Sequence, residues 1–265
     1  MDILEEIVAY KRLEIARRKS LPTAKELYRQ VEAIADRPVA SLRGALMRSD
    51  TGIIAEFKRR SPSKGWIKEN GRADVIPLSY EQNGAAALSI LADIKYFGGS
   101  DVFITDARQS GVTLPILFKD FVVDEYQLFL ARRSGASAVL LIASVLSKDV
   151  CRTLMRTAHN IGLEVLLEMH GEAETGYAEL EPDVCGVNNR NLGSFVTDVN
   201  NSLRVAALLP KDACKVSESG IGDARTIRYL RSAGYNGFLI GERFMRNDDP
   251  GVSLKRLISD IKATE

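Results

Sequence analysis

From residue 53 onward, short apolar runs alternate with longer amphipathic segments. Eight runs have the length and composition of buried strands: Ile53–Phe57, Ala86–Leu91, Pro115–Phe118, Ala138–Ile142, Val165–Met169, Val184–Val187, Cys214–Ser217 and Gly237–Ile240. Helical patterns separate them, for example at Lys148–Ile161, Asn201–Leu209 and Asp223–Ala233. Eight strands, each followed by a helix, are typical of an α/β protein with a (β/α)8 TIM barrel. A doubly wound open sheet shares the alternation, but it usually has fewer strands and lacks polar residues at the end of nearly every strand.

Residues 1–50 carry a helical pattern without intervening strands. A broad apolar face would be formed by Ile3, Leu4, Ile7, Val8, Leu13 and Ile15, with Lys11 and other charged residues elsewhere. Thr23-Ala24-Lys25-Glu26 has the spacing of a capping box and predicts a second helix through about Ala35. We therefore predict one domain, 1–265, in which residues 1–50 form a helical N-terminal extension that covers part of the barrel and could border the substrate.

The bulk composition excludes several function classes. The formal net charge of the 265 residues is +1, which does not favour nucleic acid or an anionic membrane as a partner. The acidic N-terminus does not resemble a secretory signal, and no apolar run has the length needed to cross a bilayer. The three cysteines are far apart and predict reduced thiols. We expect a cytoplasmic enzyme.

Ionisable side chains gather where the predicted strands end. In a barrel the carboxyl ends of the strands meet at one mouth, where barrel enzymes place their sites. Alternate side chains of a strand share a face, so Glu56 and Lys58 point the same way. At the mouth, three acids (Glu56, Glu168 and Glu218) would face three cations (Lys58, Lys119 and Arg190). Such crowding pushes pKa values apart and favours acid–base chemistry. Glu164 has the same parity as Glu168, and we expect it at the opposite, solvated end of the barrel.

Glycines follow the last two predicted strands. Ser219-Gly220-Ile221-Gly222-Asp223 leads into a helix, and Gly241-Glu242 follows the final apolar run. Backbone N–H groups at such turns can approach an anion, and barrels often bind phosphate with these two loops. The sequence therefore predicts a small phosphorylated substrate. With only His159 and His170 available, and without Cys/His ligand spacing, we predict neither a metal nor a cofactor. His170 follows a strand and could border the site.

Seven blocks of sequence, in order, resemble the indole-3-glycerol phosphate synthase family. They are Ile54-Ala55-Glu56-Phe57-Lys58-Arg59-Arg60-Ser61-Pro62-Ser63-Lys64-Gly65, Lys95-Tyr96-Phe97-Gly98-Gly99-Ser100, Leu117-Phe118-Lys119-Asp120-Phe121, Leu167-Glu168, Gly186-Val187-Asn188-Asn189-Arg190-Asn191-Leu192, Ser217-Glu218-Ser219-Gly220-Ile221 and Leu239-Ile240-Gly241-Glu242. The match runs along essentially the whole chain, including the helical extension. The first block is highly specific.

The resemblance implies closure of the indole ring of 1-(2-carboxyphenylamino)-1-deoxyribulose 5-phosphate, with loss of CO₂ and water, in tryptophan biosynthesis. By this analogy Lys119 is the general acid that protonates the ribulose carbonyl, and Lys58 holds the carboxylate and assists closure; either lysine could donate the decisive proton. Glu168 would be the base of the dehydration, Glu56 its partner, and Asn188 would orient the acids and the sugar. The implied substrate-binding residues are Ser61, Phe97, Phe121, Arg190, Glu218, Ser219, Gly220, Gly241 and Glu242.

Two positions depart from the family pattern. Leu91-Ala92-Asp93-Ile94 stands where relatives more often carry Thr and further acids, and Glu242 stands where some carry Ser. We expect the Glu242 carboxylate to turn away, so that only its backbone N–H helps to hold phosphate. The loops Ser61–Gly65 and Gly98–Ser100 are expected to close over the substrate. Other enzymes of the tryptophan pathway are candidate partners.

Two rival functions remain compatible with the residues. The first is another phosphate-binding barrel enzyme, either a sugar-phosphate isomerase or an aldolase whose Lys58 or Lys119 forms an imine. The second is a catalytically silent barrel that binds a phosphorylated metabolite. A silent barrel predicts loss of Lys119 or Glu168, and both are present.

Overall fold

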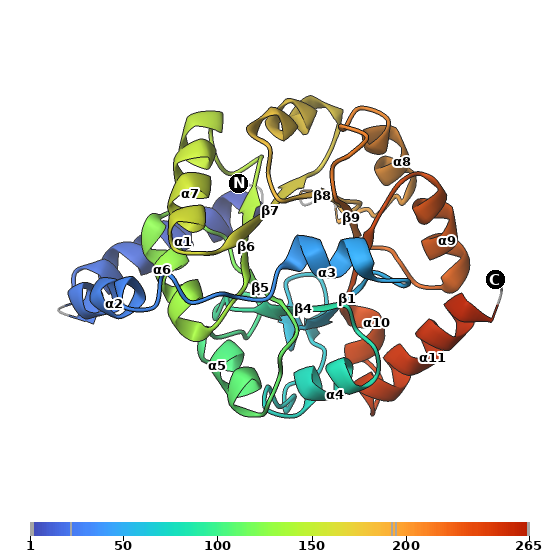
Figure 1. Ribbon diagram of the computed structural model, residues 1–265, viewed down its shortest axis with the longest axis horizontal. Helices are drawn as coiled ribbons and strands as arrows, with labels where there is room; N and C mark the ends of the chain where they lie inside the picture. Colours follow the sequence, from blue (N-terminus) through green and yellow to red (C-terminus); the bar gives the residue numbers. More distant parts are fainter. Residues whose placement is uncertain (1–2, 22, 192, 194, 264–265) are drawn as a thin grey trace.

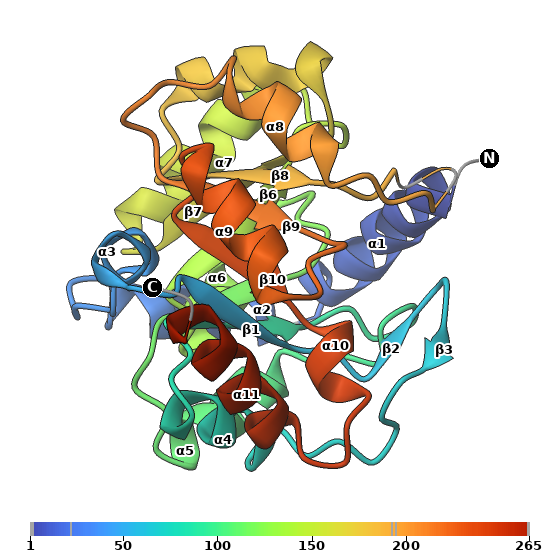
Figure 2. The same cartoon turned by 90° about the vertical axis from the view of Figure 1, so that its right-hand side faces the viewer.

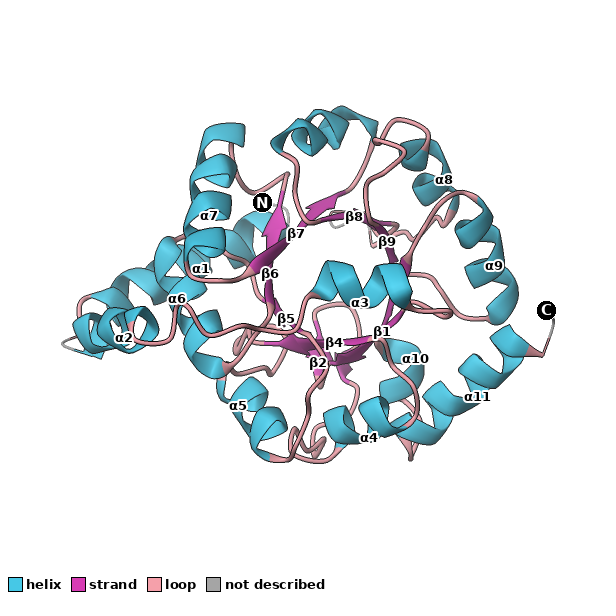
Figure 3. Ribbon diagram, in the orientation of Figure 1, coloured by secondary structure: helices cyan, strands magenta, loops and turns pink. Residues whose placement is uncertain are grey.

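The computed structural model describes residues 3–21, 23–191, 193 and 195–263. Eight parallel strands close into a barrel in the order β1-β10-β9-β8-β7-β6-β5-β4 (Figure 1). The strands are β1 (Ile53–Phe57), β4 (Ala87–Leu91), β5 (Ile116–Lys119), β6 (Ala138–Ile142), β7 (Glu164–Met169), β8 (Val184–Asn188), β9 (Lys215–Glu218) and β10 (Gly237–Ile240). Figure 3 shows them as a ring inside a layer of helices. The predicted (β/α)8 barrel is confirmed.

Alternate residues of each strand belong to two separate cores. Ile53, Ala55 and Phe57 of β1 pack outward against the helices, whereas Ile54 packs inside the barrel. The same alternation sends Leu117 of β5 and Leu166 of β7 inward. Because side chains alternate along a strand, the next inward positions are the last ones before the barrel mouth. These last inward positions are occupied by ionisable residues, although the rest of each strand is largely apolar.

The outer layer consists of helices that begin at side-chain caps in several places. It comprises α4 (Ile76–Gln82), α5 (Val102–Gln109), α6 (Glu125–Ser134), α7 (Lys148–Asn160), the 3₁₀ helix η1 (Glu172–Leu180), α8 (Asn200–Ala206), α9 (Ala224–Ser232), α10 (Glu242–Met245) and α11 (Pro250–Lys262). Ser147 caps α7 by accepting from Val150 N–H, and Asp223 caps α9 by accepting from Thr226 N–H. Such caps satisfy backbone donors that a helix leaves unpaired at its first turn. None of the described helices combines the length and the apolar character that crossing a membrane requires.

Three helices precede the barrel: α1 (Ile3–Lys19), α2 (Thr23–Glu32) and α3 (Leu42–Arg48). Figure 2 shows α1 and α3 near opposite ends of the barrel. Leu42 and Leu46 of α3 join the core inside the barrel, so this helix closes the end remote from the mouth. Glu164 lies at that end, as expected, where it accepts hydrogen bonds from the Ser41 hydroxyl and, at 2.8 Å, from Arg43 N–H. It therefore holds the first turn of α3.

One expectation about α1 is wrong. Lys11, assigned to a polar face, is only 1% exposed, whereas Leu13, assigned to the apolar face, is 62% exposed. The periodicity of the helix misleads here because Lys11 meets carboxylates from loops that are distant in the sequence. Its ion pairs with Asp93 and Asp120 offset the cost of burying its charge.

The segment that follows β1 is a small hairpin rather than a simple turn. Strands β2 (Arg60–Ser61) and β3 (Gly65–Trp66) pair antiparallel, with Gly65 at a positive φ of 64°. The Trp66 ring packs on Gly98, where an added Cβ would lie 2.7 Å from the ring. The β2–β3 hairpin therefore contacts the loop Gly98–Ser100 through Trp66, the residue after the segment Ser61–Gly65.

Candidate active site

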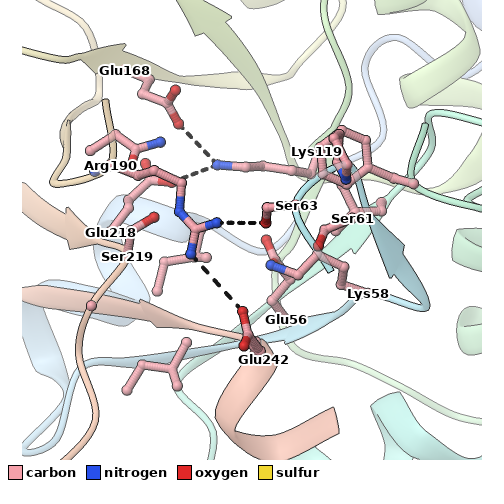
Figure 4. A pocket seen from close by; sticks show the side chains of 18 of the residues that line it. Glu56, Lys58, Ser61, Ser63, Lys119, Glu168, Arg190, Glu218, Ser219 and Glu242 are labelled. Carbon is pink, nitrogen blue, oxygen red and sulfur yellow. Dashed lines mark hydrogen bonds and ion pairs between the residues drawn. The ribbon is translucent and has the colours of Figure 1, made fainter. Parts of the chain in front are cut away.

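A pocket of about 470 Å³ opens at the carboxyl ends of the strands. This volume is within the range of small-molecule sites. Every residue proposed from the sequence lines it: Glu56, Lys58, Ser61, Phe97, Lys119, Phe121, Glu168, Asn188, Arg190, Glu218, Ser219, Gly220, Gly241 and Glu242. Figure 4 shows the labelled members of this group converging from different strands and from the segments that follow them. The barrel thus brings together residues that span most of the sequence.

Lys119 lies between two buried carboxylates (Figure 4). Its Nζ is 3.1 Å from Glu168 Oε2 and 2.5 Å from Glu218 Oε2. Lys119 and Glu218 end β5 and β9, Glu168 is the penultimate residue of β7, and each stands at the inward position dictated by strand parity. Glu168 and Glu218 are 3% and 2% exposed, so neither carboxylate is well solvated. One ammonium group therefore lies against two acids that are both shielded from water.

This sharing drives the pKa values of the group apart. Burial alone would lower the pKa of Lys119, but the charges of Glu218, Glu168 and Glu56 raise it above its ordinary value. Burial would raise the pKa of Glu168, yet Lys119 and His170 together lower it. Burial raises the pKa of Glu218 to about 8, helped by the negative charge of Glu168 and opposed by Lys119. The pKa values of the two acids are thus shifted in opposite directions, that of Glu168 downward and that of Glu218 upward.

A second ion pair stands at the end of β1. Lys58 Nζ lies 2.8 Å from Glu56 Oε1, which confirms that the two side chains point the same way. Ser89 of β4 donates to Glu56 Oε2 at 3.3 Å. Gly241 packs directly against the same carboxylate, because a Cβ there would lie 2.5 Å from Glu56 Oε1. The Glu56 side chain is therefore fixed from three sides.

His170 supports the site from outside the pocket. Its Nε2 lies 3.1 Å from Glu168 Oε1, and its Nδ1 lies 3.6 Å from Glu174 Oε2 of η1. Burial would lower the pKa of His170, but the two carboxylates raise it to about 10. The sequence suggested only that His170 could border the site. Its position two residues after Glu168 was the available signal, because strand parity sends both side chains the same way.

Arg190 and Glu242 face each other across the mouth (Figure 4). Arg190 Nη1 donates to Ser63 Oγ at 3.0 Å, and its Nη2 lies 4.0 Å from Glu242 Oε2. Glu242 Oε1 is 2.7 Å from Arg246 Nη2, one helical turn later. The expectation that the Glu242 carboxylate turns away is therefore not met, because two arginines hold it at the pocket wall. Neither Ser63 nor Arg246 was among the predicted site residues, and both lie in the pocket lining.

The loop after β9 is built for close backbone approach. Ser219 and Gly220 both have positive φ, at 69° and 76°, and a Cβ on Gly220 would lie 2.6 Å from Thr197. Asn189 fixes the turn, because its Nδ2 donates to Ser219 O at 3.0 Å. Elsewhere in the same pocket, the hydroxyl of Ser61 is buried and has no hydrogen-bond partner among the described residues. A buried donor without a partner is costly unless a ligand satisfies it.

Another part of the pocket wall is apolar. Phe97 and Phe121 lie 6.0 Å apart, centroid to centroid, at an interplanar angle of 39°. Ile3, Leu4 and Ile7 of α1 also line the pocket, so the N-terminal extension borders the site as expected. The site therefore combines an aromatic wall, a charged centre, and glycine loops with an unpaired hydroxyl. This combination can accommodate a ligand with an aromatic ring at one end and a phosphate at the other.

Comparisons with known proteins agree with this geometry. The family model described as indole-3-glycerol phosphate synthase matches residues 4–257. The chain belongs to the indole-3-glycerol phosphate synthase family. The Bacteroides thetaiotaomicron indole-3-glycerol phosphate synthase is 51% identical over 262 residues, which cover 98% of this chain and 99% of that protein. The Acidithiobacillus ferrooxidans synthase is 39% identical over 262 residues, with the same shares covered. Members of this family are carboxy-lyases of tryptophan biosynthesis with a phosphorylated substrate, and this chain is one of them.

Solved structures with low sequence identity support the fold alone. A thiamine phosphate pyrophosphorylase from Pyrococcus furiosus has a TM-score of 0.60 at 13% identity, covering 84% of this chain and 98% of its own. A mutant tryptophan synthase α-subunit from Pyrococcus furiosus has a TM-score of 0.59 at 11% identity, covering 81% of this chain and 99% of its own. Both likenesses extend over most of the barrel.

Proposed function

We propose that the pocket performs the synthase reaction with Lys119 as the general acid and Glu168 as the general base. The observation that carries this assignment is the position of Lys119 Nζ between Glu168 and Glu218, at 3.1 and 2.5 Å. The raised pKa of Lys119 keeps it protonated, and the lowered pKa of Glu168 keeps it ionised. Donor and acceptor are thus both in their working protonation states at neutral pH.

Ring closure is the first step, and it uses Lys119 as the proton donor. The aromatic carbon that bears the carboxylate attacks the ribulose carbonyl, and Lys119 transfers a proton to the carbonyl oxygen. Lys58, held by Glu56 at 2.8 Å, binds the substrate carboxylate until CO₂ leaves. The electrons of the broken carbon–carboxylate bond then restore the aromaticity of the ring. Glu218 fixes Lys119 in line with the reacting oxygen. Asn188, whose Oδ1 accepts from Arg190 N–H at 3.0 Å, lies on the sugar side with Arg190.

Dehydration is the second step, and it uses Glu168 as the proton acceptor. The hydroxyl formed in the first step leaves as water with a proton from the enzyme, and Glu168 accepts the proton whose removal completes the indole double bond. Glu56 assists in proton transfer and positioning. Across the site, Phe97 and Phe121 flank the aromatic ring. The unpaired hydroxyl of Ser61 supports a phosphate subsite near it, with the backbone of Ser219, Gly220, Gly241 and Glu242.

The test is a fluorescence assay for indole-3-glycerol phosphate with Lys119→Ala and Glu168→Gln. Loss of a positioned acid or base should lower kcat by roughly 10²- to 10⁴-fold in each variant. Lys148→Ala and Glu179→Gln are matched controls, because they break an exposed ion pair of 2.8 Å on the barrel surface. These controls should retain wild-type kcat. Near-wild-type turnover by Lys119→Ala or Glu168→Gln would refute the assigned roles.

The same preparation tests the rival functions. An aldolase would form an imine at Lys58 or Lys119 that borohydride traps in the presence of substrate, whereas the synthase should not be inactivated. A silent barrel would bind the carboxyphenylamino substrate without turnover by the wild-type chain.

We also propose that residues 1–265 act as one domain in the cytoplasm, and that other tryptophan-pathway enzymes are candidate partners. The three cysteines support a reducing compartment, because Cys151, Cys185 and Cys214 are all buried and free. Pull-down of the pathway enzymes from a cytoplasmic extract tests the partner proposal, and finding none of them bound would contradict it.

A further inference from the structure

The N-terminal extension buries a lysine against the loops that follow β4 and β5. Lys11 of α1 is 1% exposed, and its Nζ lies 2.9 Å from Asp93 Oδ2 and 3.0 Å from Asp120 Oδ1. Glu14, one turn later, accepts from the same Nζ at 3.0 Å. Burial would lower the pKa of Lys11, but the charges of Asp120 and Asp93 raise it above its ordinary value. Lys11 is therefore a permanent buried cation tied to two barrel loops.

Asp93 uses its other oxygen to shape the loop after β4. Asp93 Oδ1 accepts from Tyr96 N–H at 2.7 Å and from Phe97 N–H at 3.2 Å. Its backbone carbonyl accepts from Gly99 N–H at 2.7 Å. The side chain that pairs with Lys11 thus also holds the backbone of Phe97, one of the two rings of the aromatic wall.

Asp120 does the same for the loop after β5. Asp120 Oδ1, which faces Lys11, accepts from Phe121 N–H at 2.8 Å, while Oδ2 accepts from Gln127 Nε2 at 3.1 Å. The buried Gln127 also donates to Phe121 O at 2.9 Å. The Phe121 backbone is therefore held at both its N–H and its carbonyl. Asp120 also directly follows Lys119, the proposed acid.

A simple anchor for α1 would not need these particular partners. Lys19 already ties the end of α1 to the barrel through an ion pair of 2.8 Å with Asp124, and that pair is exposed. The Lys11 group differs because both of its aspartates hold the backbone of pocket phenylalanines. Ile7, one turn before Lys11, also lines the pocket. One buried cation thus joins α1 to both halves of the aromatic wall.

We propose that Lys11 is a positioning residue that fixes Phe97 and Phe121 at the spacing required to hold the aromatic ring of the substrate. The proposal rests on the proposed function, in which these two rings flank that ring. Lys11 does not line the pocket and so does not touch the substrate. It acts through Asp93 and Asp120, and its loss leaves the phosphate side of the pocket intact.

The test variant is Lys11→Met, with Lys19→Met as the matched control from the same helix. Loosening an aromatic contact worth about 0.5–1.5 kcal/mol should raise KM for the carboxyphenylamino substrate by roughly two- to ten-fold. The inhibition constant of inorganic phosphate, which probes the opposite end of the pocket, should stay within about two-fold of wild type. Lys19→Met should change neither constant.

The single tryptophan provides a readout that does not depend on catalysis. Trp66 packs on Gly98, inside the loop that Asp93 holds. Acrylamide quenching of Trp66 should therefore increase in Lys11→Met and remain at the wild-type value in Lys19→Met. A folded Lys11→Met protein with wild-type KM and wild-type quenching would overturn the proposal and leave Lys11 as an anchor only.

Two further sets of variants complete the test. If Lys11→Met does not fold, the triple variant Lys11→Met, Asp93→Asn, Asp120→Asn takes its place, because it also removes the two buried negative charges that Lys11→Met leaves unpaired. A wild-type KM and wild-type Trp66 quenching in the triple variant would overturn the proposal. Phe97→Ala and Phe121→Ala test the proposed function separately. An unchanged KM in both variants would refute the proposal that these two phenylalanines hold the aromatic ring of the substrate. A raised KM in both variants, together with wild-type constants in Lys11→Met, would refute only the role of Lys11.

Discussion

Replacing His170 with glutamine should remove a pH-dependent part of the stability of this enzyme. His170 is 15% exposed, and its ring nitrogens lie 3.1 Å from Glu168 and 3.6 Å from Glu174. Burial lowers its pKa, but the two carboxylates raise it from 6.5 to about 10. The difference corresponds to at most about 5 kcal/mol of stability. We expect about half of that, because Glu168 keeps its ion pair with Lys119 in the variant.

The sign of the pH dependence follows from the raised pKa. Between pH 6.5 and about 10 the folded protein keeps the His170 proton that the unfolded chain has lost. The stabilisation is therefore complete below pH 6.5 and disappears as the pH rises through about 10. The wild-type protein and His170→Gln should thus differ most in free energy of unfolding at pH 6 and least near pH 10.

Urea denaturation at pH 6, 8 and 10 measures this difference. His159→Gln is the matched control, because His159 also lies 2.8 Å from a carboxylate, that of Asp183, but is 45% exposed. Its effect should stay below about 1 kcal/mol at every pH. A His170→Gln penalty that is constant with pH, or that grows toward pH 10, would refute the reasoning.

Two substitutions test the packing of the site and of the barrel floor. Gly241→Ala should raise KM about ten-fold or more in the indole-3-glycerol phosphate assay, because its Cβ would lie 2.5 Å from Glu56; Gly171→Ala, whose Cβ meets nothing within 4 Å and which does not line the pocket, should match wild type. Leu46→Ala should lower the urea unfolding free energy by about 2–5 kcal/mol, whereas Met47→Ala, at a side chain that is 49% exposed, should change it by less than about 0.5 kcal/mol. Wild-type KM in Gly241→Ala, or equal losses at the two α3 positions, would contradict these expectations.

The sequence was informative wherever a residue's neighbours are set by strand periodicity. The predicted strands differ from β1, β4 and the other barrel strands by at most one residue at either end, because continuous apolar runs mark strands buried on both faces. Parity then placed Lys119, Glu168 and Glu218 at a common mouth without any knowledge of the ligand. The confirmed part of the site is this convergence.

The sequence was uninformative wherever a contact joins distant loops. Lys11 has the spacing of a surface residue, and nothing in its own helix reveals the two aspartates that surround it. The Arg190–Glu242 pair depends likewise on loops that meet only after the barrel closes. Helix α3 was not predicted as a separate helix, because its seven residues form too few turns to show a clear hydrophobic periodicity.

The position of α3 has a consequence for how the chain folds as it is synthesised. Leu46 packs against Gly237, and Phe238 N–H donates to Gly52 O, so the first and last strands meet beside this helix. A helix that leaves the ribosome among the first fifty residues thus gains its docking surface only when almost the entire chain has been translated. Until then the core that covers Leu42 and Leu46 inside the closed barrel is incomplete. Binding by a chaperone during translation would protect this apolar segment from aggregation. The need for such protection ends when β10 has been translated and the barrel can close.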